Sequence, residues 1–429
     1  MHHRIFICFL ILFSTVSAQD LGLSDAIHQA LETNYDIQIQ QADERIAGIQ
    51  NSWGGAGRFP TLSVSLTGTE RENDDPSGAY SQNAVTGSVT LNWLLFDGFA
   101  VNIRKSRLGE LENLSEGNTA LLVENTIQSV IMAYYHCLLQ QERMQVLEEV
   151  MQLSRDRYSY EQQRHELGSQ TRYNLLQAQN AYLEDHTNYL RQRTVFRNSV
   201  RDLNYLMGIQ NRTIYTFTDS FYVQPESFDL EALQNKLETN NTTLKNQYIN
   251  LELLKKQLAL KRSNWYPELS MRAGYDQSDS RMQFSGQPQS QSSAENQYAS
   301  LTLSWNLFTG GSRRRATEIA KVDLANGEVG IEQMKHNLVN RLYNIYELYE
   351  VRKELLNLAD ESLQAAQINL DISEEKFKTG AINSFNYRDV QLIYLNAALN
   401  RLNSIYDLID SHYSLIKLTG GIVSELGQF

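Results

Sequence analysis

The chain has 429 residues, a formal net charge of −12 and 41% hydrophobic residues. That length and apolar content are sufficient for a folded core, and the acidic balance argues against nucleic acid as a partner. Beyond the N-terminal segment no stretch reaches 18 consecutive apolar residues, so the sequence predicts no transmembrane helix.

Residues 1–18 are predicted to be a secretory signal peptide. A short basic start is followed by an apolar run over 5–13 and by a small-residue cleavage site that ends at Ala18. Cys8 lies inside the apolar run rather than directly after the cleavage point, so no lipid anchor is expected. The exported chain would keep only Cys137, and an intramolecular disulfide is then impossible.

The rest of the chain is a tandem duplication with a period of about 210 residues. Four short motifs of the first repeat return in the second after 206 to 212 residues. A repeat of this length fixes the architecture before any local prediction is made. The corresponding segments are 31–34 and 237–240, 59–63 and 266–270, 93–98 and 305–310, and 206–208 and 418–420.

Long segments without glycine or proline predict a helical hairpin in each repeat, with its turn at Gly168 or Gly380. Apolar residues three or four positions apart give these segments the spacing of a coiled coil. The returning helix is shorter than the outgoing one, and helix 229–264 is expected to supply the length missing after 170–207. The predicted helices are 20–56, 99–165 and 170–207 in the first repeat (19–208), and 229–264, 311–378 and 382–419 in the second (229–420), with an equatorial linker at 209–228 and a C-terminal tail at 421–429.

Between the helices, apolar residues alternate with small polar or charged ones. This pattern predicts two strands in each repeat, at 58–70 and 84–97 and at 264–277 and 297–309, each pair joined by a polar loop. The alternation is typical of a transmembrane β-barrel with its apolar side facing lipid, and a soluble antiparallel sheet with one wet face is the alternative. Four strands cannot close a transmembrane barrel, so several chains would have to share one.

The duplication, the strand pairs and the paired long helices together resemble the TolC family of outer-membrane channels. The most specific residues are the strand entry Phe-Pro-x-Leu-Ser at 59–63, the strand exit Trp-x-Leu-Phe-Asp-Gly at 93–98 and the hairpin tips around the two glycines. The resemblance implies a mainly α-helical homotrimer with a β-barrel portion. Three chains would share a twelve-stranded β-barrel in the outer membrane, continued by an α-helical barrel in the periplasm.

The resemblance also implies a function and partners. Such channels are passive exit ducts of tripartite efflux pumps or type I secretion systems. They meet a periplasmic adaptor (membrane fusion) protein and an inner-membrane pump of the RND, ABC or MFS type. The hairpin tips are the expected adaptor contacts, and they comprise Leu167, Gly168, Ser169, Thr379, Gly380 and Ala381.

In the family, the inner hairpin of each protomer closes the periplasmic end, and two acidic residues one helical turn apart line the constriction. Counted from Gly380, those positions hold Asn386 and Asp389, so only the second is acidic here. A family arginine shortly after the tip glycine corresponds to Ile382. The predicted gate residues are Asp389, Asn386, Arg388, Tyr387 and Asn174. A solvated charge is the alternative for Asp389, and coiled-coil packing is the alternative for Tyr387.

No enzyme site is indicated. The histidines are dispersed without zinc-motif spacing, and neither a phosphate-binding loop nor a nucleophile elbow is present. We therefore expect no cofactor, metal or catalytic residue. A periplasmic coiled-coil scaffold or adaptor without a membrane barrel is the alternative function, and it leaves the four alternating strands unexplained.

Overall fold

The computed structural model describes residues 19–75, 78–210, 215–222 and 224–425, and the predicted signal peptide lies outside the described residues. The chain forms two compact units. The hairpin unit comprises the described parts of Met1–Gln38, Leu121–Asn241 and Asn337–Phe429. The sheet unit comprises the described parts of Ile39–Ala120 and Thr242–His336.

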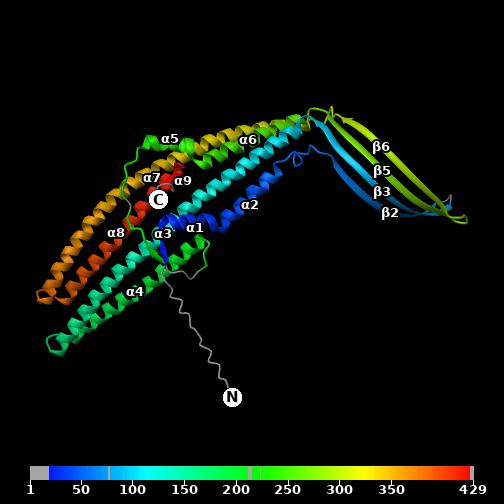
Figure 1. Ribbon diagram of the computed structural model, residues 1–429. Coiled ribbons are helices and arrows are strands. Elements are labelled where there is room, and N and C mark those ends of the chain that lie inside the picture. Colours follow the sequence, from blue (N-terminus) through cyan, green and yellow to red (C-terminus); the bar gives the residue numbers. More distant parts are fainter. Residues whose placement is uncertain (1–18, 76–77, 211–214, 223, 426–429) are drawn as a thin grey trace, which may run out of the picture. The chain divides into compact units, whose positions relative to one another are not determined.

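Two helical hairpins of equal size carry the hairpin unit. Helix α3 (Ala100–Glu166) is followed by α4 (Arg172–Leu206), and α7 (Ser312–Lys378) is followed by α8 (Ser384–Leu418). The outgoing helices have 67 residues each and the returning helices 35 each. In Figure 1, α3 and α4 run side by side to one tip, and α7 and α8 to another. The equal lengths confirm that the duplication includes the hairpins.

The single helices expected over 20–56 and 229–264 are each two helices. The first is replaced by β1 (Gln19–Leu21), α1 (Leu23–Thr33) and α2 (Tyr35–Gln50), and the second by α5 (Leu230–Asn240) and α6 (Thr242–Ser263). The expected linker contains β4 (Tyr215–Phe217), which pairs in parallel with β1, and the expected tail contains α9 (Ile422–Glu425).

The helix breaks at Asn34 and Asn241 have the same physical cause. The Asn34 carboxamide donates from Nδ2 to the Leu206 carbonyl at the end of α4 (2.9 Å), and its Oδ1 accepts the first amides of α2. Asn241 Nδ2 donates in the same way to the Leu418 carbonyl at the end of α8 (2.9 Å). A helix end leaves carbonyls without an intrahelical partner, and these side chains supply one.

These contacts correct two expectations. The end of α4 meets the start of α2, so the predicted continuation of α4 by helix 229–264 is wrong. The second half of that segment, α6, starts at the end of α8. They also correct the alignment of the repeats near their start. The Cβ that Gly208 lacks would lie 2.5 Å from the Thr33 carbonyl, and that of Gly420 2.7 Å from the Asn240 carbonyl. The structural offset is therefore 207 residues here, rather than the 206 of the motif.

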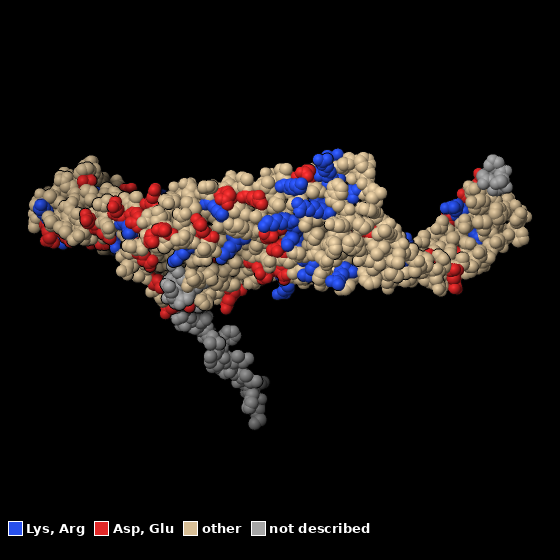
Figure 2. Space-filling view, turned by 90° about the horizontal axis from the view of Figure 1, so that it is seen from above, with Lys and Arg blue, Asp and Glu red and all other residues tan. Residues whose placement is uncertain are grey.

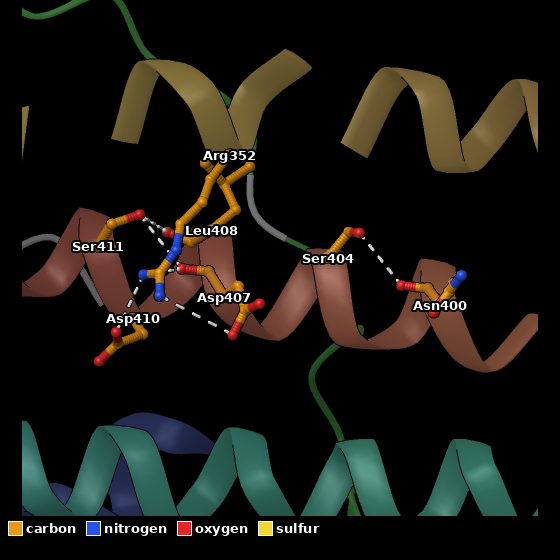
Figure 3. A network of polar contacts seen from close by, with 7 residues as sticks. All are labelled: Arg352, Asn400, Ser404, Asp407, Leu408, Asp410 and Ser411. Carbon is orange, nitrogen blue, oxygen red and sulfur yellow. Dashed lines mark hydrogen bonds and ion pairs between the residues drawn. The ribbon is translucent and has the colours of Figure 1, made fainter. Parts of the chain in front are cut away.

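The main apolar core of the hairpin unit is built around Tyr134 of α3, which is fully buried. Its hydroxyl donates to the Asp219 carboxylate (2.6 Å) and also contacts the Leu21 carbonyl (2.9 Å), which ties α3 to both short strands. Burial raises the pKa of Tyr134, and the Asp219 carboxylate raises it further. A polar clamp joins the second hairpin: Arg352 of α7 donates to the Asp407 carbonyl and pairs with Asp410 on α8 (Figure 3).

The sheet unit contains a four-stranded antiparallel sheet. Its strands are β2 (Thr61–Asp75), β3 (Gly78–Asp97), β5 (Glu268–Phe284) and β6 (Ser290–Ser304), in the order β2-β3-β5-β6. They extend further into the loops than the sequence predicted. The polar residues of the loops continue the backbone hydrogen bonding between the strands. Beyond the apolar segment both faces of the sheet can carry polar side chains, so the strand pairing does not end there.

The register places the apolar positions on one face. Leu62 is paired with Leu91, and Leu91 with Ala273. The neighbouring polar positions are paired in the same way, with Ser63 opposite Thr90. Directly opposed residues in antiparallel strands share a face, so one face is apolar and the other is polar.

A buried histidine should make the hairpin unit sensitive to acid. His412 is 5% exposed among Phe228 and Tyr349, and its Nδ1 has no hydrogen-bond partner among the described residues. Burial lowers the pKa of His412 below its usual 6.5. Below pH 6.5 the unfolded chain therefore binds a proton at this histidine more readily than the folded chain does. The free energy of unfolding keeps its full value above this pH and decreases as the pH falls below it.

We expect the melting temperature of the purified protein to fall between pH 7.5 and pH 5.5, and His412→Leu to reduce that fall. His136, whose pKa burial also lowers, leaves a residual dependence. His28→Leu, which removes a histidine at an exposed position, is the control substitution. An equal fall in wild type and His412→Leu would contradict the assignment.

Candidate functional site

The two hairpin tips are built alike. Gly168 and Gly380 adopt φ angles of 73° and 76°, which are left-handed values that favour glycine. The amide after each glycine bonds back to the outgoing helix, from Ser169 to the Arg164 carbonyl (2.9 Å) and from Ala381 to the Lys376 carbonyl (2.8 Å). This is the Schellman arrangement, which closes the carbonyl end of a helix.

All six predicted tip residues are exposed, and Leu167 has 82% of its surface free. A Cβ added at Gly168 or Gly380 would meet no atom within 4 Å. Glycine is therefore needed there for its backbone conformation and not for packing within the chain. The tips present a small surface, partly apolar, that nothing else in the described chain covers.

Two predicted gate residues share an exposed face at the start of α8, and two others point inward. Asn386 and Asp389 are exposed and three residues apart, which places them on the same side of the helix. Tyr387 is 3% exposed, and the Arg388 side chain is 14% exposed. Asn174 lies at the first tip, where its Nδ2 donates to Gln170 (2.8 Å). The five residues therefore do not form one cluster within the chain.

The guanidinium of Arg388 makes a bidentate ion pair with Asp185 of α4. Its two terminal nitrogens lie 2.7 and 2.8 Å from the two carboxylate oxygens, and one of them also lies 3.1 Å from the Ser154 hydroxyl on α3. The side chain of Asp185 is only 4% exposed. The pair thus connects the second hairpin to both helices of the first, with two parallel charge-assisted hydrogen bonds.

Further buried polar groups extend this contact along α3. Arg157 and Glu161 are 4% and 0% exposed, and Arg157 donates to the Ser384 carbonyl at the start of α8 (3.1 Å). Burial, followed by the charge of Arg388, lowers the pKa of Arg157 to about 10. Arg157 is therefore still protonated at neutral pH. We call Ser154, Arg157, Glu161, Asp185 and Arg388 the polar seam.

An aromatic cluster covers the polar seam on the side of the tips. Phe377 and Tyr387 stack with their ring centroids 4.8 Å apart, and Tyr160 of α3 packs edge-on against Phe377 at 5.0 Å. The Tyr160 hydroxyl donates to the Lys378 carbonyl at the end of α7 (3.2 Å). Burial, and after it the nearby Glu374 carboxylate, raises the pKa of Tyr387. Tyr387 therefore packs between the hairpins.

The sequence analysis missed the polar seam except for Arg388. A signal was present in the heptad spacing. Ala178, Asp185 and Ser199 are buried at intervals of seven or fourteen along α4, with the partly buried Gln192 between the last two, so Asp185 is the charged member of a heptad series. Ser154 and Glu161 are likewise seven residues apart on the buried side of α3. A charged residue in a heptad core position is a recognisable sign of a partner across the interface.

The chain belongs to the outer membrane efflux protein family. The family model with that description matches residues 26–209 and 233–421, one match for each repeat. The TolC-like fold and the efflux-channel function expected from the sequence are thereby confirmed, and the scaffold alternative is not supported. No helix among the described residues has an apolar stretch long enough to cross a membrane.

Solved structures show the same fold at low sequence identity. CusC is 15% identical with a TM-score of 0.75, and the alignment covers 94% of this chain and 92% of CusC. The CmeC outer membrane channel of Campylobacter jejuni is 15% identical, with a TM-score of 0.71 and coverage of 93% and 85%. The MtrE outer membrane channel of Neisseria gonorrhoeae, in its open state, is 16% identical, with a TM-score of 0.68 and coverage of 95% and 93%. No curated protein matches the chain in sequence.

Removing Arg388 should loosen the two hairpins where they meet. Arg388→Ala leaves the Asp185 carboxylate buried without its counter-charge, and the loss of one partner of a buried pair costs about 3–5 kcal/mol. We expect faster hydrogen exchange of the backbone amides of α4 and α8 near the polar seam. Arg401→Ala is the control, because the exposed Arg401–Asp360 pair is worth only about 0–1 kcal/mol. Equal exchange in the two variants would contradict a structural role for the seam.

Proposed function

We propose that three copies of the chain form an outer-membrane exit channel whose periplasmic end is closed by the hairpins. The four-stranded sheet supports this assembly, because β2 and β6 are its outer strands and each has one edge that pairs with no other described strand. Unpaired backbone edges are not tolerated in lipid. With four alternating strands per copy, β6 of one copy can pair antiparallel with β2 of the next, and three copies give a closed barrel of twelve strands.

The apolar face of the sheet supports its insertion in a membrane. Val64 and Leu66 are 77% and 78% exposed, and Leu301 and Leu303 are each 67% exposed. In a soluble protein such a surface would need a cover. The opposite face carries polar contacts such as Thr86 to Ser278 (3.0 Å), as expected for a water-filled lumen.

Arginine substitutions test which face meets lipid. Leu91→Arg and Leu301→Arg should each cost about 2–4 kcal/mol at a mid-membrane position and lower the yield of detergent-extracted trimer. Thr90→Arg and Thr302→Arg are the matched controls, since each changes the neighbouring residue on the polar face. Assembly of all four variants at the same yield would reverse or remove the assignment of faces.

The channel is a passive duct of a tripartite efflux pump or a type I secretion system. Its partners are a periplasmic adaptor protein, which meets the exposed tips at Leu167, Gly168, Ser169, Thr379, Gly380 and Ala381, and an inner-membrane pump of the RND, ABC or MFS type. The tips support this docking because they are exposed and fixed by their glycines. The cargo is selected by the pump.

The bidentate Asp185–Arg388 pair is the main support for a gate at the periplasmic end. It anchors the start of α8 to the first hairpin of the same chain. Opening the periplasmic end requires α8 to leave that position, so the pair and the stacked aromatic rings beside it hold the closed state. Asp389 and Asn386, on the opposite, exposed face of α8, line the constriction, where three copies of Asp389 approach one another.

Block by cations tests the position of Asp389. A narrow ring of three carboxylates binds multivalent cations, and occupancy of the ring stops the current. In planar-bilayer recordings, Asp389→Ala should raise the concentration of a periplasmic trivalent cation needed for half-block by about tenfold, equivalent to about 1.4 kcal/mol. Glu361→Ala, at an exposed position on α7, should leave it unchanged. If half-block were the same in Asp389→Ala and wild type, Asp389 would not line the constriction.

A further inference from the structure

All four tryptophans of the chain lie at one end of the sheet, where the strands join the helices. Trp93 and Trp305 lie two residues after Leu91 and Leu303, so they continue the apolar faces of β3 and β6. The other two, Trp53 and Trp265, lie just before β2 and β5. Tryptophan is enriched where the apolar part of a bilayer meets its polar headgroups.

In each repeat one tryptophan lies under a guanidinium and the other donates its indole N–H to a neighbouring backbone carbonyl. The guanidinium of Arg58 lies 4.5 Å from the ring of Trp53, and the Trp93 indole donates to the Arg58 carbonyl (3.0 Å). In the second repeat the guanidinium of Arg313 lies 4.9 Å from the ring of Trp265. The Trp305 indole donates to the Trp265 carbonyl (3.1 Å). The duplication has kept the indole hydrogen bond from Trp93 or Trp305 to the backbone before the first strand, and each repeat adds one guanidinium over one indole from a different position.

The same region is strongly basic in an acidic chain. The segments 53–59, 97–107, 255–268 and 306–321 hold twelve Lys and Arg against three Asp and Glu, whereas the whole chain carries −12. Figure 2 shows Lys and Arg gathered over the helices beside the start of the sheet. Arg262 and Arg314 are exposed and form no ion pair with any described residue. Arg314 interacts electrostatically with Glu318, but neither side chain is held in a direct ion pair, so both can meet an anionic partner.

In the first repeat, a hollow of about 350 Å³ brings tryptophan and arginine side chains together. It is lined by Arg58 and Trp93, by apolar residues such as Leu95, Phe99 and Val101, and by Asp97, whose carboxylate is neutralised by Arg104. Phe99 has φ 68°, the only positive φ of a non-glycine residue in the described chain, and it is 57% exposed. The equivalent position in the second repeat is Gly311, also at positive φ. A phenylalanine at a position that favours glycine points to a role for its ring.

We propose that this belt of arginine and tryptophan binds the phosphate headgroups of anionic phospholipids in the periplasmic leaflet of the membrane. The exposed guanidinium groups of Arg58, Arg262 and Arg314 bind the phosphate through paired hydrogen bonds, and the indole and phenyl rings contact the upper acyl chains. The inference rests on the proposed insertion of the sheet in a membrane. It adds a lipid class to that placement, because a zwitterionic headgroup would leave the excess positive charge unneutralised.

The tryptophans report on their own lipid neighbours. The full-length protein is reconstituted in phosphatidylcholine vesicles that contain increasing fractions of either brominated phosphatidylglycerol or brominated phosphatidylcholine. Bromine quenches only nearby indoles, and all four lie in the belt. We expect the quenching curves to give a preference of about tenfold for the anionic lipid, as a few uncompensated cations at a membrane surface would produce.

The variant Arg58→Gln/Arg262→Gln/Arg314→Gln should reduce this preference to about twofold or less, since each cation near the surface adds to the attraction. The control variant Arg191→Gln/Arg193→Gln/Arg197→Gln removes three exposed arginines of α4 and should keep the full preference. Equal quenching by the two lipids in wild type, or an undiminished preference in the first variant, would overturn the lipid inference alone. Absence of quenching by both lipids would overturn it together with the insertion of the sheet.

Discussion

The ends of α4 and α8 are the points on which the hairpin unit depends. A returning helix of 35 residues cannot match an outgoing helix of 67, so the shorter helix must end in the interior of the unit with its last carbonyls satisfied. The carboxamides of Asn34 and Asn241 satisfy them, and the same two residues begin the next helices, α2 and α6. Gly208 and Gly420 permit the close approach, because any side chain there would meet a backbone carbonyl.

The polar seam gives the hairpins a different kind of contact from the core around Tyr134. The core is held by apolar burial, which tolerates small shifts between helices. The bidentate Asp185–Arg388 pair permits one geometry only. Desolvation of both charges makes the net contribution of the pair to stability small, but removal of one partner alone is costly because the other charge stays buried. Such a contact specifies one register between the two hairpins. It can be broken at little net cost when a conformational change returns both charges to water. These are suitable properties for the proposed gate.

The sheet unit combines an apolar face, two free edges and a basic aromatic rim in consecutive stretches of chain. The faces follow from the register and the edges from the number of strands, so both are consequences of the backbone. The rim depends on side chains, and each repeat places one arginine over one indole from non-equivalent positions, Arg58 over Trp53 and Arg313 over Trp265. The same combination arises from different positions in the two repeats, which is consistent with the proposed contact with the membrane.

Much of this architecture was determined by the sequence alone, because it depends on local periodicity. The hairpins turning at Gly168 and Gly380 and the alternating strands can be recognised within windows of a few tens of residues, and the duplication by comparing short motifs about 210 residues apart. The exposed positions of Asn386 and Asp389 also agree with the local helical spacing. The family follows from the order of these features.

Only the tertiary structure decided how the segments meet. Arg388 and Asp185 are 203 residues apart, and neither neighbourhood indicates that the two will pair. Asn34 breaks a helix whose local pattern continues through it, because the Leu206 carbonyl, 172 residues away, needs a donor. The same holds for the hollow beside Arg58 and Trp93, which brings together residues before β2 and at the end of β3. Such contacts depend on packing between distant segments, and no local pattern contains that information.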